Sequence, residues 1–188
     1  MTPTFFTSPD ALPADTPNAP PNVVLVGISG AGKSSVGRAV GLALGRAFLD
    51  FDDEIERRAE ISIAAIFAER GEGRFREMER QLTEDCAQMA GMILAPGGGW
   101  IGNIGVIELL RPPAQMIYLK VRPESASRRL AEGGVVRPLL TRGGNPAKTL
   151  EKMLAEREPL YAKSDVSVNT EMYDLERLIH RVTDVIKG

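Results

Sequence analysis

Short apolar runs alternate with segments of helical periodicity along most of the chain. The first run, Val23–Val26, is followed directly by glycine, and later runs of the same kind cover residues 47–50, 92–95, 115–121 and 166–169. A continuous apolar run is typical of a strand that is buried on both faces, as in a parallel sheet. The pattern therefore predicts five strands in a mostly parallel sheet.

Helical periods fill the intervals between these runs. After the first strand, Val36, Val40 and Leu44 recur on one face, and Gly45 stands where such a helix would end. An amphipathic stripe predicts a last helix that covers one face of the sheet, through Leu175, Leu178, Ile179, Val182 and Ile186. Strands that alternate with helices predict a three-layer α/β/α fold, in which ligands bind at the carboxyl ends of the strands.

Residues 1–22 lack both periodicities. This segment holds six prolines and no Lys or Arg, whereas a signal or transit peptide would need early positive charge. We expect a disordered, acidic extension without regular hydrogen bonds, and a folded domain over residues 23–188. The alternative is that the extension docks on the body or on a partner.

The composition fits one globular domain. The chain has 188 residues, of which 43% are hydrophobic and 26% charged. Its 23 basic and 25 acidic side chains leave a net charge of -2, so it lacks the electrostatic footprint of proteins that bind nucleic acid or an anionic membrane. A single cysteine cannot build a disulfide framework, and no apolar run approaches a membrane span. We expect a cytoplasmic monomer.

A phosphate-binding motif follows the first strand. The segment Gly27–Ser34 has the spacing G-x-x-x-x-G-K-S between a strand and a helix, the context in which its backbone N–H groups can cradle phosphates. The nucleotide contacts are expected at Gly30, Ala31, Gly32, Lys33, Ser34 and Ser35. Lys33 would reach the β- and γ-phosphates and Ser34 would ligate Mg²⁺. The alternative, a glycine-rich turn without function, leaves this context unexplained.

Two carboxylates follow the second strand. Asp50 and Asp52 lie at its carboxyl end, where one could face a metal ion at the phosphates and the other an acceptor. The alternative for Asp52 is that it caps a helix beginning near Asp53. The pair is therefore a candidate for the second half of a phosphoryl-transfer site.

Four further segments carry candidate ligands. Gly97–Gly99 follow the third apolar run, and their amides could approach a ligand closely; a plain turn is the alternative. Arg76 lies at the start of a long helix, where a solvated charge is the alternative. Glycines flank Arg137 within residues 131–146, which is typical of a mobile lid; a disordered surface loop is the alternative. Arg157 remains as a candidate for binding an acceptor anion.

Together these segments resemble the shikimate kinase family, which phosphorylates shikimate from ATP on the way to chorismate and the aromatic amino acids. The resemblance runs from about Val23 to the end of the chain. It rests on six ordered motifs, which are the phosphate loop, Asp50-x-Asp52, Ser62–Phe67 with Gly71–Glu72 and Phe75–Arg76, Gly97–Gly99, Arg137–Leu140, and Arg157-x-Pro159–Tyr161. It implies a P-loop kinase fold with a mobile lid.

The resemblance also implies roles on the nucleotide side. Lys33 and Arg137 would stabilise the transferring phosphoryl group. Ser34 would bind Mg²⁺, and Asp50 would hold the ion through water. Asp52 would bind the ring hydroxyls of shikimate and position or deprotonate the 3-hydroxyl that attacks ATP.

On the acceptor side, the resemblance implies that Arg76 and Arg157 clamp the shikimate carboxylate, with Glu79 orienting Arg76. Gly97–Gly99 would contribute amides, and Arg129 would stack near the adenine. A planar guanidinium matches a carboxylate with two hydrogen bonds, whereas lysine acts as a point charge. The acceptor is therefore expected to be a small hydroxylated acid.

The chain departs from the family at two places. Some relatives have an arginine beside the adenine after the last strand, where this chain reads Asn169–Glu171. Glu60 stands where relatives often end a helix with glycine.

Three residues outside the motifs were also considered. Cys86 is expected in the core and His180 at the surface. Trp100 either shapes the acceptor pocket or packs under a loop.

Two other functions compete with shikimate phosphorylation. One is another small-molecule kinase on the same scaffold, acting on gluconate or a nucleoside monophosphate. The paired Arg76 and Arg157 favour a carboxylate acceptor instead. The other is a catalytically silent regulatory module. The presence of Lys33, Asp52 and Arg137 together argues against it, because a silent module would not need all three.

Overall fold

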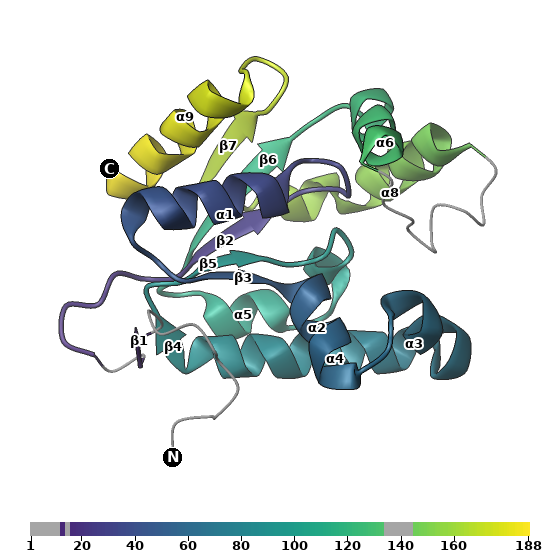
Figure 1. Ribbon diagram of the computed structural model, residues 1–188, viewed down its shortest axis with the longest axis horizontal. Helices are drawn as coiled ribbons and strands as arrows, with labels where there is room; N and C mark the ends of the chain where they lie inside the picture. Colours follow the sequence, from purple (N-terminus) through teal and green to yellow (C-terminus); the bar gives the residue numbers. More distant parts are fainter. Residues whose placement is uncertain (1–11, 14–15, 134–144) are drawn as a thin grey trace.

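The described residues form a five-stranded parallel sheet. A computed structural model describes residues 12–13, 16–133 and 145–188 (Figure 1). The strands lie in the order β3-β5-β2-β6-β7, and every neighbouring pair is parallel. Their bounds are Val23–Val26 for β2, Phe48–Asp50 for β3, Ile93–Ala95 for β5, Gln115–Lys120 for β6 and Val166–Asn169 for β7. The predicted sheet is confirmed.

Helices cover both faces of this sheet. On one face, α1 (Lys33–Leu44) packs beside α9 (Leu175–Lys187), and on the other lie α4 (Gly71–Ala87) and α5 (Val106–Leu110) (Figure 1). Helix α2 (Phe51–Ala59) and helix α3 (Ile63–Glu69) pack against α4, and α6 (Pro123–Glu132) packs against α8 (Pro146–Tyr161). The three-layer α/β/α prediction is therefore confirmed.

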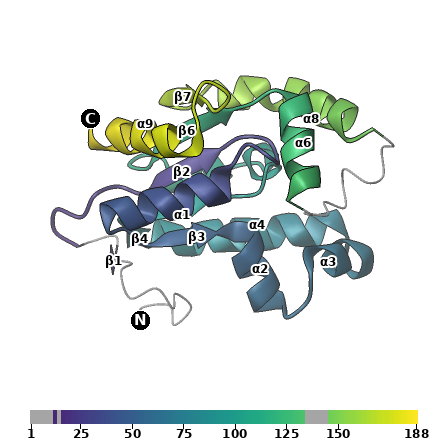
Figure 2. The same ribbon diagram turned by 45° about the horizontal axis from the view of Figure 1, so that its top comes forward.

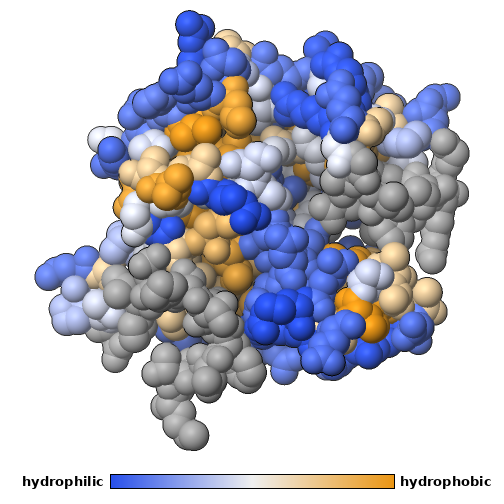
Figure 3. Space-filling model, in the orientation of Figure 1, coloured by the Kyte–Doolittle hydropathy of each residue, from blue (hydrophilic) through white to orange (hydrophobic). Residues whose placement is uncertain are grey.

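The core lies between these layers. The β2 residues Val23–Val26 are buried, as continuous apolar runs predicted. Helix α1 ends at Gly45, whose φ of 61° lies in the left-handed region that favours glycine. Figure 3 shows hydrophobic side chains between α1 and α9 and hydrophilic ones over α2. No helix among the described residues is both long and apolar enough to cross a bilayer.

The amino-terminal segment contacts the body at several points. Strand β1 (Leu12–Pro13) pairs antiparallel with β4 (Met89–Ala90), and the buried Asn22 side chain donates to the carbonyls of Cys86 and Met89. The expectation that residues 1–22 make no regular hydrogen bonds is wrong at these points, because an edge pairing of two residues leaves no periodicity in the sequence. The expected disorder falls mainly on residues 1–11 and 14–15, which lie outside the described residues.

Removing β1 is expected to lower the melting temperature slightly and to leave catalysis unchanged. A two-residue pairing contributes about 1–2 kcal/mol, which corresponds to a fall in Tm of about 2–8 °C for a chain of this size. Strands β1 and β4 lie at the end of the sheet opposite to α2 (Figure 1). Deletion of residues 1–15 should be compared by calorimetry with deletion of residues 1–11, which keeps β1. An equal loss in both deletions would contradict this origin.

Candidate active site

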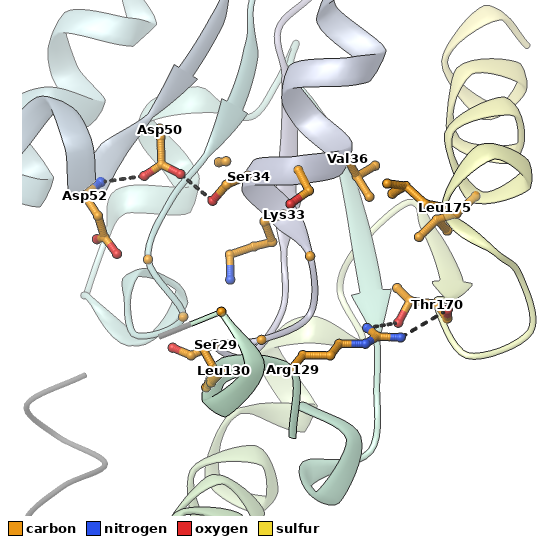
Figure 4. A pocket seen from close by; sticks show the side chains of 18 of the residues that line it. Ser29, Lys33, Ser34, Val36, Asp50, Asp52, Arg129, Leu130, Thr170 and Leu175 are labelled. Atoms are coloured by element: carbon orange, nitrogen blue, oxygen red, sulfur yellow. Dashed lines mark hydrogen bonds between the residues drawn. The ribbon is translucent and has the colours of Figure 1, made fainter. Parts of the chain in front are cut away.

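A cavity of about 510 Å³ opens at the carboxyl ends of β2, β3 and β5. One end is bounded by Asp52 and Gly97, the middle by the loop before α1, and the far end by Arg129 and Thr170 (Figure 4). Strand ends of a parallel sheet meet at one edge, which is why segments distant in sequence share this cavity. The loop before α1, the carboxylates after β3 and Arg129 thus border one continuous space.

The loop between β2 and α1 forms the middle of the cavity. Its lining residues include Gly30, Gly32, Lys33, Ser34 and Ser35. The amino end of α1 points its unpaired N–H groups here, so the site attracts anions. Of the expected nucleotide contacts, Ala31 does not line the cavity, because its side chain is buried in the hydrophobic core.

Lys33 lies folded against this loop. Its Nζ donates to the backbone oxygens of Gly27 at 2.8 Å and Ile28 at 3.2 Å. The residue is 9% exposed and lines the cavity. Its ammonium group is therefore held at the place where a phosphate chain would lie along the loop amides.

Asp50 joins the phosphate loop to α2. Its carboxylate accepts from the Ser34 hydroxyl at 2.5 Å and from the amides of Asp52 and Asp53 at 2.9 and 3.4 Å (Figure 4). Asp50 is thus the N-cap of α2, which begins at Phe51. The alternative in which Asp52 caps a helix beginning near Asp53 is wrong, because the helix begins at Phe51, directly after the strand.

The Ser34 hydroxyl and the Asp50 carboxylate also fit a magnesium ion. Both are oxygen ligands of the kind that Mg²⁺ prefers. Among the described residues, no three His, Cys, Asp or Glu side chains form a cluster that could hold a metal ion. An ion at Ser34 and Asp50 would therefore depend on phosphate oxygens and water for its remaining ligands.

Asp52 lies at the other end of the cavity. It stands in the first turn of α2, is 9% exposed, and lines the cavity beside Gly97. A Cβ added at Gly97 would fall 2.9 Å from Asp52 Oδ1 and 3.4 Å from Glu79 Oε1. The two carboxylates therefore face the same small space at Gly97.

The glycine loop after β5 is held between the phosphate loop and α4. A Cβ at Gly98 would fall 2.9 Å from the Ser29 amide nitrogen, and one at Gly99 would fall 2.5 Å from the Arg76 guanidinium. Any larger residue would push one neighbour away. Glycine is thus required at Gly98, where the close neighbour is backbone, whereas at Gly99 the neighbour is the end of a flexible arginine side chain that could shift.

Arg76 and Arg157 converge on this glycine loop from separate helices. Arg157 Nη1 donates to the Gly98 oxygen at 3.2 Å, and Arg76 Nη1 donates to Glu79 Oε2 at 2.6 Å. Burial raises the pKa of Glu79, and the charges of both arginines oppose this rise. Arg76 lies inside α4, which begins at Gly71 rather than near Phe75. The two arginines border the glycine loop but do not line the 510 Å³ cavity itself.

Two tyrosines without a predicted role support this arrangement. Tyr161 donates its hydroxyl to the Gly98 oxygen at 2.8 Å, and its ring stacks on Tyr118 with centroids 4.8 Å apart. Tyr118 in turn donates to Glu158 at 2.9 Å. These contacts tie α8, which carries Arg157, to the sheet. The signal in the sequence was weak, because a buried tyrosine reads as core.

The far end of the cavity is formed by α6 and the segment after β7. Arg129 Nη1 donates to Thr170 Oγ1 at 3.0 Å, and Tyr173 and Leu175 line the wall beside them. Glu171 holds the segment in place by accepting from Ser125 at 2.6 Å and from Arg122. Thr170 and Tyr173 were missed in the sequence, since no motif marks them.

The other residues singled out in the sequence are a lid arginine, a cysteine, a histidine and a tryptophan. Arg137, with most of the lid expected over residues 131–146, lies outside the described residues. Cys86 is fully buried in the core and His180 is exposed on α9, both as expected. Trp100 packs under the glycine loop, with its indole N–H donating to Thr83 at 2.9 Å and its ring against Phe51.

Glu79 is the buried carboxyl at the centre of this arrangement. Its side chain is fully buried, and burial raises its pKa to about 7, an effect that the Arg76 charge opposes. Because this folded-state pKa exceeds the ordinary value of 4.5, the folded protein binds the proton more tightly than the unfolded chain does. Burial of Glu79 therefore costs stability above pH 7, and this cost is relieved as the pH falls toward 4.5.

The stability of the protein relative to Glu79→Gln is expected to depend on pH. The unfolding free energy of the wild type minus that of the variant should rise by about 3 kcal/mol as the pH falls from above 7 to 4.5. Urea unfolding at a series of pH values measures this difference. A difference that stays constant over this range would contradict the shifted pKa.

Comparison with known proteins agrees with this geometry. The family model for shikimate kinase matches residues 29–187. Shikimate kinases from Chromohalobacter salexigens and Moorella thermoacetica are 40% and 34% identical over 152 and 169 residues, which cover 80% and 90% of this chain and 83% and 96% of those proteins. The structure of shikimate kinase from Acinetobacter baumannii in complex with shikimate matches with a TM-score of 0.83 and 34% identity, covering 89% of this chain and 93% of that one. The chain belongs to the shikimate kinase family.

Proposed function

We propose that this protein transfers the γ-phosphoryl group of ATP to the 3-hydroxyl of shikimate, giving shikimate 3-phosphate and ADP. The observation that carries the proposal is the single cavity that joins the phosphate loop to Asp52. Two arginines converge on the glycine loop at its acceptor side. The family relatives named above are shikimate kinases. We further propose that the enzyme acts in the cytoplasm as a monomer.

The nucleotide half binds ATP along the amino end of α1. The loop amides and Lys33 hold the β- and γ-phosphates, while Ser34 and Asp50 hold Mg²⁺, with Asp50 acting through water. The ion, when bound with ATP, neutralises charge on the phosphate oxygens. Arg129 flanks the base at the far end of the cavity.

The acceptor half binds shikimate beside the glycine loop. Arg76 and Arg157 pair with its carboxylate, and the amides of Gly97, Gly98 and Gly99 face its ring oxygens. This pairing selects a carboxylate, because each guanidinium offers two parallel N–H donors to it. The hydroxyl that attacks ATP is thereby directed toward Asp52.

The reaction forms one bond and breaks another at phosphorus. The Asp52 carboxylate accepts the proton of the 3-hydroxyl as its oxygen bonds to the γ-phosphorus, and the bond to the β,γ-bridging oxygen breaks to release ADP. Such a transition state is loose and highly charged, so catalysis depends on positioning and on electrostatic stabilisation. Lys33, with Arg137 from the lid, supplies positive charge to the transferring group.

A coupled assay of ADP release with ATP, Mg²⁺ and shikimate tests the proposal. Shikimate should be turned over with a far higher kcat/KM than gluconate or nucleoside monophosphates. If another acceptor is turned over with a higher kcat/KM than shikimate, that acceptor is the substrate and the proposal is wrong. Shikimate binding in calorimetry without any turnover would identify a regulatory module instead.

A further inference from the structure

A partly buried ion cluster joins α2 to α4 outside the cavity. Arg58 Nε lies 2.7 Å from Glu54 Oε1 on its own helix, and Arg58 Nη1 lies 2.5 Å from Asp85 Oδ2 on α4. The Glu54 side chain is 8% exposed, that of Arg58 21% and that of Asp85 26%. We call these three residues the α2–α4 bridge. None of them lines the 510 Å³ cavity.

The bridge and Asp50 are two polar anchors of α2, whose Phe51 and Ile55 side chains are also buried in the core. Asp50 binds the Ser34 hydroxyl and caps the helix. Helix α2 has nine residues and ends at Glu60 with a φ of 57°, and so short a helix is unstable without tertiary contacts. Figure 2 shows α2 running outward from the carboxyl edge of the sheet. Its second half is tied to α4 through Arg58.

Asp52 lies between these two anchors. The helix on the other side of the bridge, α4, carries Arg76 and Glu79. The bridge therefore connects the helix that carries Asp52 to the helix that carries Arg76, and these two residues belong to the acceptor half of the site. If the bridge opened, the second half of α2 would lose this tie to α4, so the angle between the two helices could change and with it the separation of Asp52 from Arg76.

We propose that the α2–α4 bridge positions Asp52 against Arg76, which makes Arg58 and Asp85 positioning residues for the acceptor half. The inference rests on the proposed function, since Asp52 and Arg76 act there on shikimate. The bridge residues act through α2 and α4 and touch neither reactant. ATP binding is anchored separately by the loop before α1, so it should not depend on the bridge.

The test compares Asp85→Asn, Arg58→Met and the double variant with the wild type. Both single variants should lower kcat/KM for shikimate about 10-fold and change KM for ATP less than twofold, because misplaced reacting groups cost rate steeply. The double variant should be little worse than either single variant, since both remove one contact. Asp85→Glu, which keeps the carboxylate, should recover most of the loss.

Arg57→Met is the matched control. Arg57 binds the same Glu54 carboxylate at 2.8 Å from the same helix, with a side chain that is 51% exposed. Its loss should leave kcat/KM for shikimate within about twofold of the wild type, the small effect usual for exposed ion pairs. Melting temperatures of all variants should be recorded, so that kinetics are compared only where each protein is folded.

Three results would overturn the positioning role. They are equal kinetic losses in Arg57→Met and Arg58→Met, equal losses for ATP and shikimate, or a lower melting temperature with unchanged kinetic constants. Asp85→Asn preserves the shape of the side chain, so it keeps the test usable if Arg58→Met fails to fold. A wild type that does not phosphorylate shikimate would reject the proposed function, whereas an active wild type with unaffected variants rejects the bridge alone.

Discussion

Replacing Asp52 with asparagine is expected to lower kcat by about 10²-fold or more, the usual range for losing general acid–base help. Asparagine keeps the shape of the side chain and removes both the negative charge and the proton acceptor. Asp52 lines the acceptor end of the cavity and belongs to α2, not to the loop before α1 that is proposed to bind the phosphates. The affinity for ATP should therefore change little. Steady-state kinetics with saturating shikimate, together with a nucleotide titration, measure both effects.

Asp53→Asn is the matched control for this prediction. Asp53 is the next residue of α2, but it is exposed and pairs with Arg38 at 3.8 Å. Its replacement should leave kcat within about twofold, because surface ion pairs contribute little. Near-normal turnover in folded Asp52→Asn would remove Asp52 from the chemistry and leave it as a residue of the first helical turn.

Removing either arginine at the glycine loop is expected to weaken shikimate binding by roughly 10- to 200-fold. A charge-assisted hydrogen bond contributes about 1.5–3 kcal/mol net, and each 1.4 kcal/mol is about tenfold in affinity. Arg157→Ala is the cleaner variant, because Arg76→Ala also leaves the buried Glu79 without its partner. Arg157→Lys should recover only part of the affinity, since an ammonium cannot form the planar pair. Calorimetric titration with shikimate measures each variant.

Arg80→Ala serves as the control for the arginines. Arg80 lies on α4 one turn beyond Arg76, and its guanidinium donates to the Ile104 oxygen at the surface. Its loss should leave shikimate affinity unchanged. Normal shikimate affinity in Arg76→Ala and Arg157→Ala, with weakened ATP binding, would contradict the carboxylate-binding role and the choice of this acid as acceptor.

The sequence predicted those parts of the molecule that local patterns encode. The five strands, the stop of α1 at Gly45 and the phosphate loop each follow from a run, a turn residue or a fixed spacing. The cap of α2 was not predicted, because only Asp52 was considered and the helix was expected to begin near Asp53, whereas it begins at Phe51 directly after the strand. In the structure, the Asp50 carboxylate accepts from the backbone amides of Asp52 and Asp53, which identifies Asp50 as the cap.

Other features depend on contacts between distant segments. Thr170 and Tyr173 reach the cavity because β7 lies beside β6, which no single stretch of sequence reveals. The pairing of β1 with β4 likewise joins residues nearly eighty positions apart. The buried state of Glu79 depends on how α4 meets the sheet, so its pKa could not be predicted from its place in a charged helix.

The continuous cavity has a stereochemical consequence for the proposed reaction. Because Asp52 and Lys33 border one space, the acceptor oxygen and the departing ADP can lie on opposite sides of the same phosphorus atom. A displacement in that geometry is in line. One such displacement turns the three equatorial oxygens through a plane, so a chiral γ-phosphoryl group would reach the product with inverted configuration.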